Sequence, residues 1–216
     1  MHKEILNKTQ LALLPIVESF SNRGFYLAGG TALSLQLGHR ESIDFDLFTE
    51  KEFKNTEIIK ILKENFEQDQ MQVLIDVLDE YTLLINDTKV TFLRYPFQMK
   101  DIEKEEGINI ANFLTIGAMK AYAIGRRSKW KDYVDIYTLL QKYSLEDILN
   151  KTSEIFGSLF SSKMFLQQLA YFKDIDYTEE VIWRIENPPS MEAIQKYLVN
   201  ISVEYLGKPS TRSLAS

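Results

Sequence analysis

Hydrophobic residues recur first at the spacing of an α-helix and then at the spacing of β-strands. Leu6, Leu13, Val17 and Phe20 lie on one face of a predicted helix that ends near residues 21–24. The next residues, FYLAG at 25–29, predict a short apolar strand, and TALSLQLG at 31–38 predicts a short helix that ends at a glycine. In SIDFDLF, residues 42–48, hydrophobic and acidic residues alternate, which predicts a strand with one apolar and one acidic face.

Strand patterns continue to about residue 97 and helical patterns follow them. Residues 52–66 predict a helix, and three strands are predicted over 71–78, 81–86 and 89–97, the last two joined by a turn at NDT. Helices are predicted over 111–130, 132–144, 145–156, 162–172 and 178–186, with one more after Pro189. We therefore expect an α/β core over 1–105, a helical domain over 106–206 and a disordered tail over 207–216, with the ligand site in a cleft between core and helices.

Composition narrows the chemistry that this fold can carry. The 216 residues are 45% hydrophobic and 26% charged, as in ordinary globular proteins, and no run is apolar enough for a membrane helix or a signal peptide. We therefore expect a cytoplasmic protein. Because there is no cysteine and only two histidines, a bound metal would be a hard cation on carboxylates, Mg²⁺ or Mn²⁺. The net charge of −6 opposes general affinity for nucleic acid but leaves a local basic patch possible.

Two short motifs near the N-terminus suggest a shared ligand. Gly29, Gly30 and Thr31 lie between a strand and a helix, where backbone N–H groups and a hydroxyl favour an anion; the alternative is a tight turn with Thr31 as helix cap. Asp44 and Asp46 point to one face of their strand and repel each other by roughly 1–4 kcal/mol unless a proton or cation intervenes. A solvated acidic face is the alternative. Because only one short helix separates the two motifs, their strands are expected to be neighbours, which favours a ligand carrying both phosphate and metal.

A second group of charged residues lies in the helical half. Lys120 lies in an apolar helix, where it either binds an anion or extends to solvent. Asp132 either takes part in the site or only begins a helix, where it shares a face with Asp135. The segment RRSKWK contains Arg126, Arg127, Lys129 and Trp130, and a basic patch with an aromatic ring suits RNA, although a solvated loop explains it equally well.

The string LAGGTALSLQLGHRESIDFDLF, residues 27–48, resembles the AbiEii/AbiGii toxin branch of the nucleotidyltransferase superfamily. Further matches occur in VTFLRYPF, in AMKAYAIGRRSKWKDYVDIYTLLQKYSLEDIL and in QQLAYFKDID, so that the resemblance covers about residues 25–176. It implies an α+β chain, with the mixed, helix-flanked sheet of the nucleotidyltransferase fold followed by a helical C-terminal domain.

The resemblance also implies a function. The chain would transfer a nucleoside monophosphate from an NTP to an RNA, with tRNA as the expected acceptor, in a toxin–antitoxin or abortive-infection system with a cognate antitoxin protein. The catalytic residues implied are Asp44, Asp46, Lys120 and Asp132. Asp44 and Asp46 would bind Mg²⁺ or Mn²⁺, while Gly29, Gly30, Thr31 and Lys120 would bind the nucleotide.

One position departs from the pattern of the superfamily. Where many nucleotidyltransferases have a third carboxylate, VTFLRYPF has Thr91, and a threonine cannot act as a general base near neutral pH. Either another group such as Asp132 activates the acceptor, or one metal binds weakly, or the protein is slow or inactive. The rival hypothesis is therefore a nucleotide- or RNA-binding protein that has lost turnover. Transfer onto a protein hydroxyl is a third possibility.

Overall fold

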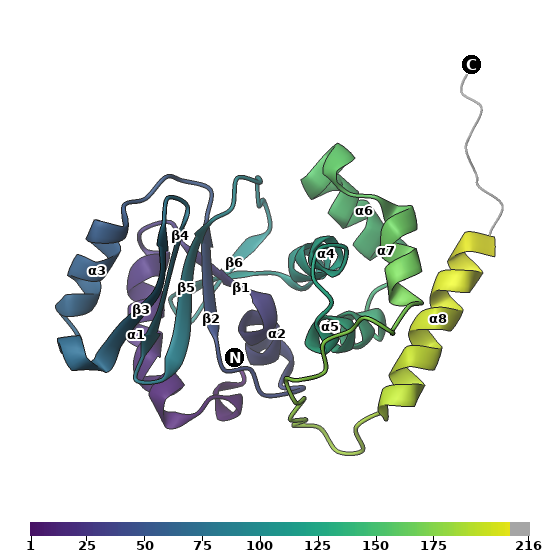
Figure 1. The fold of residues 1–216 in the computed structure, drawn as a ribbon, viewed down its shortest axis with the longest axis horizontal. Helices are drawn as coiled ribbons and strands as arrows, with labels where there is room; N and C mark the ends of the chain where they lie inside the picture. The colour runs from purple at the N-terminus through teal and green to yellow at the C-terminus, as the bar shows by residue number, and fades with distance from the viewer. Residues whose placement is uncertain (208–216) are drawn as a thin grey trace.

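A mixed β-sheet and a bundle of helices make up the computed structural model, which describes residues 1–207 (Figure 1). The strands are β1 Tyr26–Ala28, β2 Phe45–Thr49, β3 Met71–Val77, β4 Glu80–Ile85, β5 Thr88–Arg94, β6 Ile102–Glu105 and β7 Ile108–Ala111. The helices are α1 Lys8–Ser21, α2 Gly29–Leu37, α3 Asn55–Lys63, α4 Phe113–Ile124, α5 Trp130–Leu140, α6 Leu145–Phe156, α7 Ser162–Leu169 and α8 Met191–Gly207. Short 3₁₀ turns occupy Lys3–Ile5, Gln68–Gln70 and Gly157–Leu159.

The register of the sheet places the polar residues of three strands in one row. The strand order is β3-β4-β5-β2-β1-β7-β6, with β2 parallel to β5 and antiparallel to β1. Asp46 pairs with Ala28 on one side and with Thr91 on the other, and Thr91 in turn pairs with Thr82 of β4. Laterally paired residues project to the same face of a sheet, so Asp46, Thr91 and Thr82 share a face. The two sequence motifs therefore lie on neighbouring strands, as expected.

Helices cover the two faces of the sheet differently. In Figure 1, α1 and α3 lie on one side of the sheet, while α2 and the helical half lie on the other. Helix α4 is the centre of that half, since α2, α5, α6 and α7 all pack against it. The side chain of Asn112 caps α4 by accepting a hydrogen bond from the Thr115 backbone N–H at 2.9 Å. This cap fixes the start of α4, the helix that lines one cavity together with the polar row of Asp46, Thr91 and Thr82.

Two expectations about the secondary structure need correction. Residues 178–186 form an extended strap and no helix: the backbone N–H of Arg184 donates to His39 O, and Ile182 O accepts from the N–H of Glu41. These long-range bonds satisfy the backbone groups that a helix would have paired locally. The sheet also continues past residue 105, because the hairpin of β6 and β7 runs to Ala111 and joins β1.

Helix α8 extends to Gly207, and residues 208–216 of the expected tail lie outside the described residues. Among helices within residues 1–207, none has the length and apolar character that crossing a membrane requires.

Candidate active site

The two glycines bring two charged side chains against the start of α2. Gly29 has a positive φ of 72°, and a Cβ atom added there would lie 2.6 Å from Asp46 Oδ2. A Cβ atom at Gly30 would lie 2.6 Å from Arg40 Nη2. Gly29 therefore requires glycine, because its backbone is left-handed and a side chain would meet the Asp46 carboxylate, and a side chain at position 30 would have to displace the Arg40 guanidinium. The strand-to-helix turn is thus a tight one, and it holds the Asp46 carboxylate beside the N-terminus of α2.

Thr31 has a structural place that differs from the one expected. Its side chain is buried, and its hydroxyl contacts Ser42 Oγ at 2.9 Å and donates to the backbone carbonyl of Asp44. The hydroxyl therefore fixes the loop that leads into β2. It is not exposed to a triphosphate, so the expected contact of Thr31 with the nucleotide does not agree with its position.

Asp44 and Asp46 differ in their electrostatic surroundings. Lys89 of β5 forms an ion pair with Asp44, 2.7 Å from Nζ to Oδ2. Among residues 1–207, by contrast, no hydrogen bond or ion pair to the Asp46 carboxylate is present. Burial raises the pKa of Asp46, and the nearby charge of Asp44 raises it further. Lys89, Lys120 and Arg127 lower this pKa from a distance, so Asp46 has cations nearby but no direct counter-charge among the described residues.

A buried network of charges lies between α2, α4 and α5. Lys120 Nζ lies 2.6 Å from Asp132 Oδ1 and 2.7 Å from Asp135 Oδ2, so two carboxylates hold one ammonium. Asp135 is fully buried and accepts two hydrogen bonds, both 2.8 Å long, from the Arg40 guanidinium. Asp132 accepts from Arg127 Nε at 2.8 Å. The network ties the loop before β2 to the helical half.

The network shifts the pKa values of its members in a consistent direction. Burial alone would raise the pKa of Asp132 and Asp135, but the adjacent cations outweigh it and lower both, that of Asp135 well below its ordinary value. Burial would lower the pKa of Lys120, and its two aspartates instead raise it. All three groups are therefore charged at neutral pH. Because Asp132 is buried and held by two cations, the general-base role considered for it does not fit its position.

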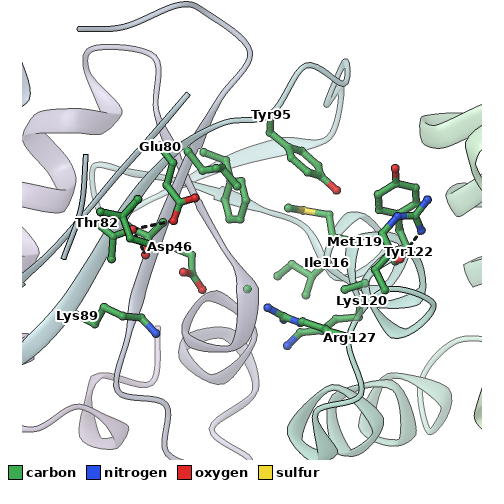
Figure 2. A pocket seen from close by; sticks show the side chains of 17 residues that line it. Asp46, Glu80, Thr82, Lys89, Tyr95, Ile116, Met119, Lys120, Tyr122 and Arg127 are labelled. Atoms are coloured by element: carbon green, nitrogen blue, oxygen red, sulfur yellow. Dashed lines mark hydrogen bonds between the residues drawn. The ribbon is translucent and has the colours of Figure 1, made fainter. Parts of the chain in front are cut away.

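Two cavities meet at Asp46. The larger, called the cleft, has a volume of about 560 Å³ and lies between the β2–β5–β4 face of the sheet and helix α4 (Figure 2). Its apolar lining consists of Phe48, Ile75, Leu93, Tyr95, Ile116, Met119, Tyr122 and Ala123. Its polar surface consists of Asp46, Glu80, Thr82, Thr91, Lys89 of β5, Lys120 of α4, and Arg126 and Arg127 after α4.

The smaller cavity, called the chamber, has a volume of about 100 Å³ and is lined almost entirely by charged residues. Its cations are Arg40, Lys89, Lys120, Arg127, Lys129 and Lys131, and its acids are Asp44, Asp46, Asp132 and Glu179. The extended strap contributes Glu179, which pairs with Lys129 and, at 3.3 Å, with Lys131. Asp46, Lys89, Lys120 and Arg127 line both cavities, so the two cavities form one continuous site.

The basic segment after α4 divides into different environments. Arg127 and Lys129 line the chamber, so they lie closer to the aspartates than an RNA-binding surface alone would require. The Arg126 guanidinium lies 3.5 Å from the ring centroid of Tyr122 and donates to the carbonyls of Tyr122 and Leu159. Trp130 is 6% exposed and packs against aromatic rings of the helical half. The expectation that Trp130 stacks on an RNA base therefore conflicts with its burial.

Several residues of the site were not identified from the sequence. Arg40, Lys89, Glu80 and Glu179 line the cavities, and Asp135 had been placed only on the same helix face as Asp132. Arg40 stands inside the motif LAGGTALSLQLGHRESIDFDLF, which is the one local signal for it. Lys89 and Glu80 lie on strands and Glu179 lies in the strap, and the local sequence pattern does not predict how these segments pair. Thr91 does line the cleft beside Asp46, as its register requires.

Comparison with known proteins gives this site a family. Residues 12–107 match the family described as "Nucleotidyl transferase AbiEii toxin, Type IV TA system", a range that includes both glycines and both aspartates. The protein aq_aa25 from Aquifex aeolicus strain VF5, whose function is uncharacterised, is 31% identical over 209 residues, which cover 94% of this chain and 98% of that protein. The chain belongs to the AbiEii nucleotidyltransferase toxin family.

Solved structures agree with the AbiEii family assignment at the level of the fold. JHP933 from Helicobacter pylori superimposes with a TM-score of 0.59 at 17% identity, covering 94% of this chain and 92% of that one. MenT4, a nucleotidyltransferase toxin from Mycobacterium tuberculosis H37Rv, superimposes with a TM-score of 0.56 at 12% identity, covering 94% of this chain and 85% of that one. This AbiEii family member therefore has the nucleotidyltransferase fold, with a helical C-terminal region.

Proposed function

We propose that this AbiEii family member is a metal-dependent nucleotidyltransferase that transfers a nucleoside monophosphate from an NTP to the 3′ end of an RNA, with tRNA as the acceptor. The observation that carries the proposal is the junction at Asp46: an apolar cleft large enough for a nucleoside opens directly into a small chamber lined by six cations and four acids. An NTP has the same two parts, an uncharged nucleoside and a polyanionic tail. The site thus suits the whole substrate.

The phosphate groups would lie in the chamber. Lys89, Arg127 and Lys129 present cationic groups there, and charge-assisted hydrogen bonds to phosphate are among the strongest that proteins form. Lys120 lies beneath them, held by its two aspartates, and contributes fixed positive charge. Gly29 lines the cleft and Gly30 lines the chamber, so the start of α2 borders both cavities, and a helix N-terminus favours an anion.

The residues present fit a divalent cation. Asp46 has a pKa raised by burial and by Asp44, and no protein cation within residues 1–207 contacts its carboxylate. Mg²⁺ is commonly held by one or two carboxylates together with substrate phosphates and water, which matches Asp44 and Asp46 beside the chamber. Mn²⁺ favours the same oxygen ligands. When bound, such an ion neutralises charge on the reacting phosphate.

The chemical step follows from the order of groups along the site. The acceptor 3′ hydroxyl oxygen forms a bond to the α-phosphorus, the bond from the α-phosphorus to the bridging oxygen of the β-phosphate breaks, and pyrophosphate leaves. The cations of the chamber stabilise the charge that develops on pyrophosphate. The acceptor hydroxyl approaches from the cleft side of Asp46, beside the nucleoside of the NTP.

RNA as the acceptor is supported by the basic residues at the edge of the site. Arg126 and Arg127 follow α4 directly, are exposed and line the cleft, so they are placed to contact the backbone of an entering strand. We place the protein in the cytoplasm, where NTPs and tRNA are found. A cognate antitoxin protein would restrain it, as the family description of a toxin–antitoxin system suggests.

The second candidate function is binding without turnover. It is favoured by Thr91, which occupies the position beside Asp46 where many nucleotidyltransferases have a third carboxylate. Such a protein would bind Mg²⁺ and NTP in the same cavities and transfer nothing.

Mass spectrometry of intact tRNA separates the two candidates. Total tRNA is incubated with the protein, Mg²⁺ and each NTP in turn, and we expect a mass increase of one or more nucleoside monophosphates with at least one NTP. Parallel incubations with total cell protein as acceptor test transfer onto a protein hydroxyl. NTP binding without a mass change in any acceptor would favour the binder, and an increase confined to protein would replace RNA as the acceptor.

A further inference from the structure

Glu80 lies on the same face of the sheet as Asp46, at the end of the cleft away from the chamber. It precedes Thr82 by two residues on β4, and Thr82 pairs with Thr91, the neighbour of Asp46. Side chains two residues apart on a strand share a face. Figure 2 shows the carboxylates of Glu80 and Asp46 both directed into the cleft. Glu80 lines the cleft but not the chamber.

The carboxylate of Glu80 is held close to Thr91, the position where many nucleotidyltransferases have a third carboxylate. The Thr82 hydroxyl donates to Glu80 Oε1 at 3.0 Å and lies 3.3 Å from Thr91 Oγ1. The Thr82 hydroxyl thus lies within hydrogen-bond distance of both the Glu80 carboxylate and the Thr91 hydroxyl. This bond directs the carboxylate along the sheet toward Thr91, whereas a free glutamate would sample many rotamers.

We propose that Glu80 is a catalytic residue that accepts the proton of the attacking acceptor hydroxyl, in place of a carboxylate at position 91. The proposal rests on the proposed nucleotidyl transfer. In an in-line displacement, the attacking oxygen and the leaving pyrophosphate lie on opposite sides of the α-phosphorus. The chamber receives pyrophosphate, so the attacking hydroxyl lies on the cleft side, where Glu80 stands.

The acceptor hydroxyl loses its proton to Glu80 as it attacks. As the hydroxyl oxygen bonds to the α-phosphorus, its O–H bond breaks and the proton passes to the Glu80 carboxylate. The electron pair of the breaking phosphorus–oxygen bond leaves with pyrophosphate. Glu80 then returns its proton to water, to which the partly exposed side chain has access. Thr82 keeps the carboxylate in place through the cycle.

Four variants test the assignment: Glu80→Gln, Thr91→Asp, the double variant of both, and Glu103→Gln as the control. Glu103 is an exposed acid on β6 at the opposite edge of the sheet. General-base assistance contributes roughly 10²- to 10⁴-fold, so Glu80→Gln is expected to lower kcat by about 10²-fold. Because the group acts on the acceptor, the Kd of Mg²⁺ with a non-hydrolysable NTP should change by no more than about twofold.

The double variant distinguishes a lost base from a disturbed fold. Thr91→Asp places a carboxylate directly beside Asp46, so adding it to Glu80→Gln should restore at least roughly tenfold of the lost kcat. Circular dichroism and thermal unfolding confirm that each variant is folded.

Each result has one consequence. A Glu80→Gln protein as active as Glu103→Gln overturns the assignment while leaving the proposed function intact. Loss of NTP affinity in proportion to kcat, or a double variant no better than Glu80→Gln, also overturns it. A wild-type chain that binds NTP and transfers nothing overturns the proposed function, and the role of Glu80 with it.

Discussion

Replacing Asp135 by asparagine keeps the shape of the side chain and removes its charge, which tests the two roles that the buried network assigns to its aspartates. Asp135 is fully buried and bonds to Arg40, Lys120 and His39. Asp132 is buried too, but it shares Lys120 with Asp135 and its other partner, Arg127, has a side chain that is 54% exposed. Asp135 is therefore predicted to hold the fold, and Asp132 to position the site.

The expected costs differ for a physical reason. Removing one partner of a buried ion pair typically costs about 3–5 kcal/mol, because the other charge remains buried without compensation. Asp135→Asn leaves the guanidinium of Arg40, which is 1% exposed, in that state. Asp132→Asn leaves Lys120 with one carboxylate, and Arg127 can turn to water, so we expect roughly the 1.5–3 kcal/mol of a hydrogen bond to a charged group.

Urea unfolding monitored by circular dichroism measures both costs, with the double variant Arg40→Gln/Asp135→Asn closing a mutant cycle. The double variant should lose less than the sum of its single variants, since the two residues act as a pair. The pKa of Asp135 is lowered in the folded state, so its contribution is complete above its ordinary value of about 3.9 and is lost as the pH falls below it. Asp135→Asn should therefore weaken the dependence of stability on pH only in this acidic range.

Measurements of nucleotidyl-transfer activity test the second role, the positioning of the site by Asp132. Asp132→Asn should lower nucleotidyl transfer strongly, because Lys120 and Arg127 lose the carboxylate that orients them toward the chamber. Equal losses of stability in Asp132→Asn and Asp135→Asn, or additive effects of Arg40 and Asp135, would refute this division of roles.

Three further predictions concern the charges around Asp46. Asp46→Asn should raise the free energy of unfolding at neutral pH, because the raised pKa marks a carboxylate that destabilises the fold once the pH exceeds that pKa. In the same variant, calorimetry should show that Mg²⁺ no longer increases NTP affinity. A lower stability together with an intact Mg²⁺ dependence contradicts this prediction. Arg127→Gln should weaken NTP binding by roughly tenfold and leave nucleoside binding unchanged, with Arg126→Gln as the matched control; equal losses for both ligands would remove Arg127 from the phosphate site. Glu179→Gln should strengthen NTP binding, since it frees two lysines of the chamber, and an unchanged Kd would show that the strap does not compete with phosphate.

Much of the site could be predicted from the sequence because its motifs are local. The glycine pair, the short helix and the alternating aspartates are separated by few residues, so β1 and β2 were expected to be neighbours, and Ala28 does pair with Asp46. The three strands between residues 71 and 97 were found for the same reason, since alternation and turn residues are local signals.

The rest depends on contacts between distant residues. Arg40 and Asp135 are 95 residues apart, and the sequence around each of them does not indicate that they form a pair. Glu80 reaches the cleft only through the register of β4 on β5. Residues 178–186 have helical periodicity, but pairing with residues 39–41 holds them extended. Trp130 follows basic residues as a nucleic-acid-binding ring would, and packing in the helical half buries it.

Transfer from NTPs labelled at either the α- or the γ-phosphate tests the central claim most directly. With Mg²⁺ and total tRNA, the wild-type protein should transfer label to RNA from the α-labelled NTP and none from the γ-labelled NTP, because the γ-phosphate leaves with pyrophosphate. Asp46→Asn should transfer neither label while remaining folded. RNA labelled from the γ-phosphate, or Asp46→Asn as active as the wild type, would contradict nucleotidyl transfer at the junction of cleft and chamber.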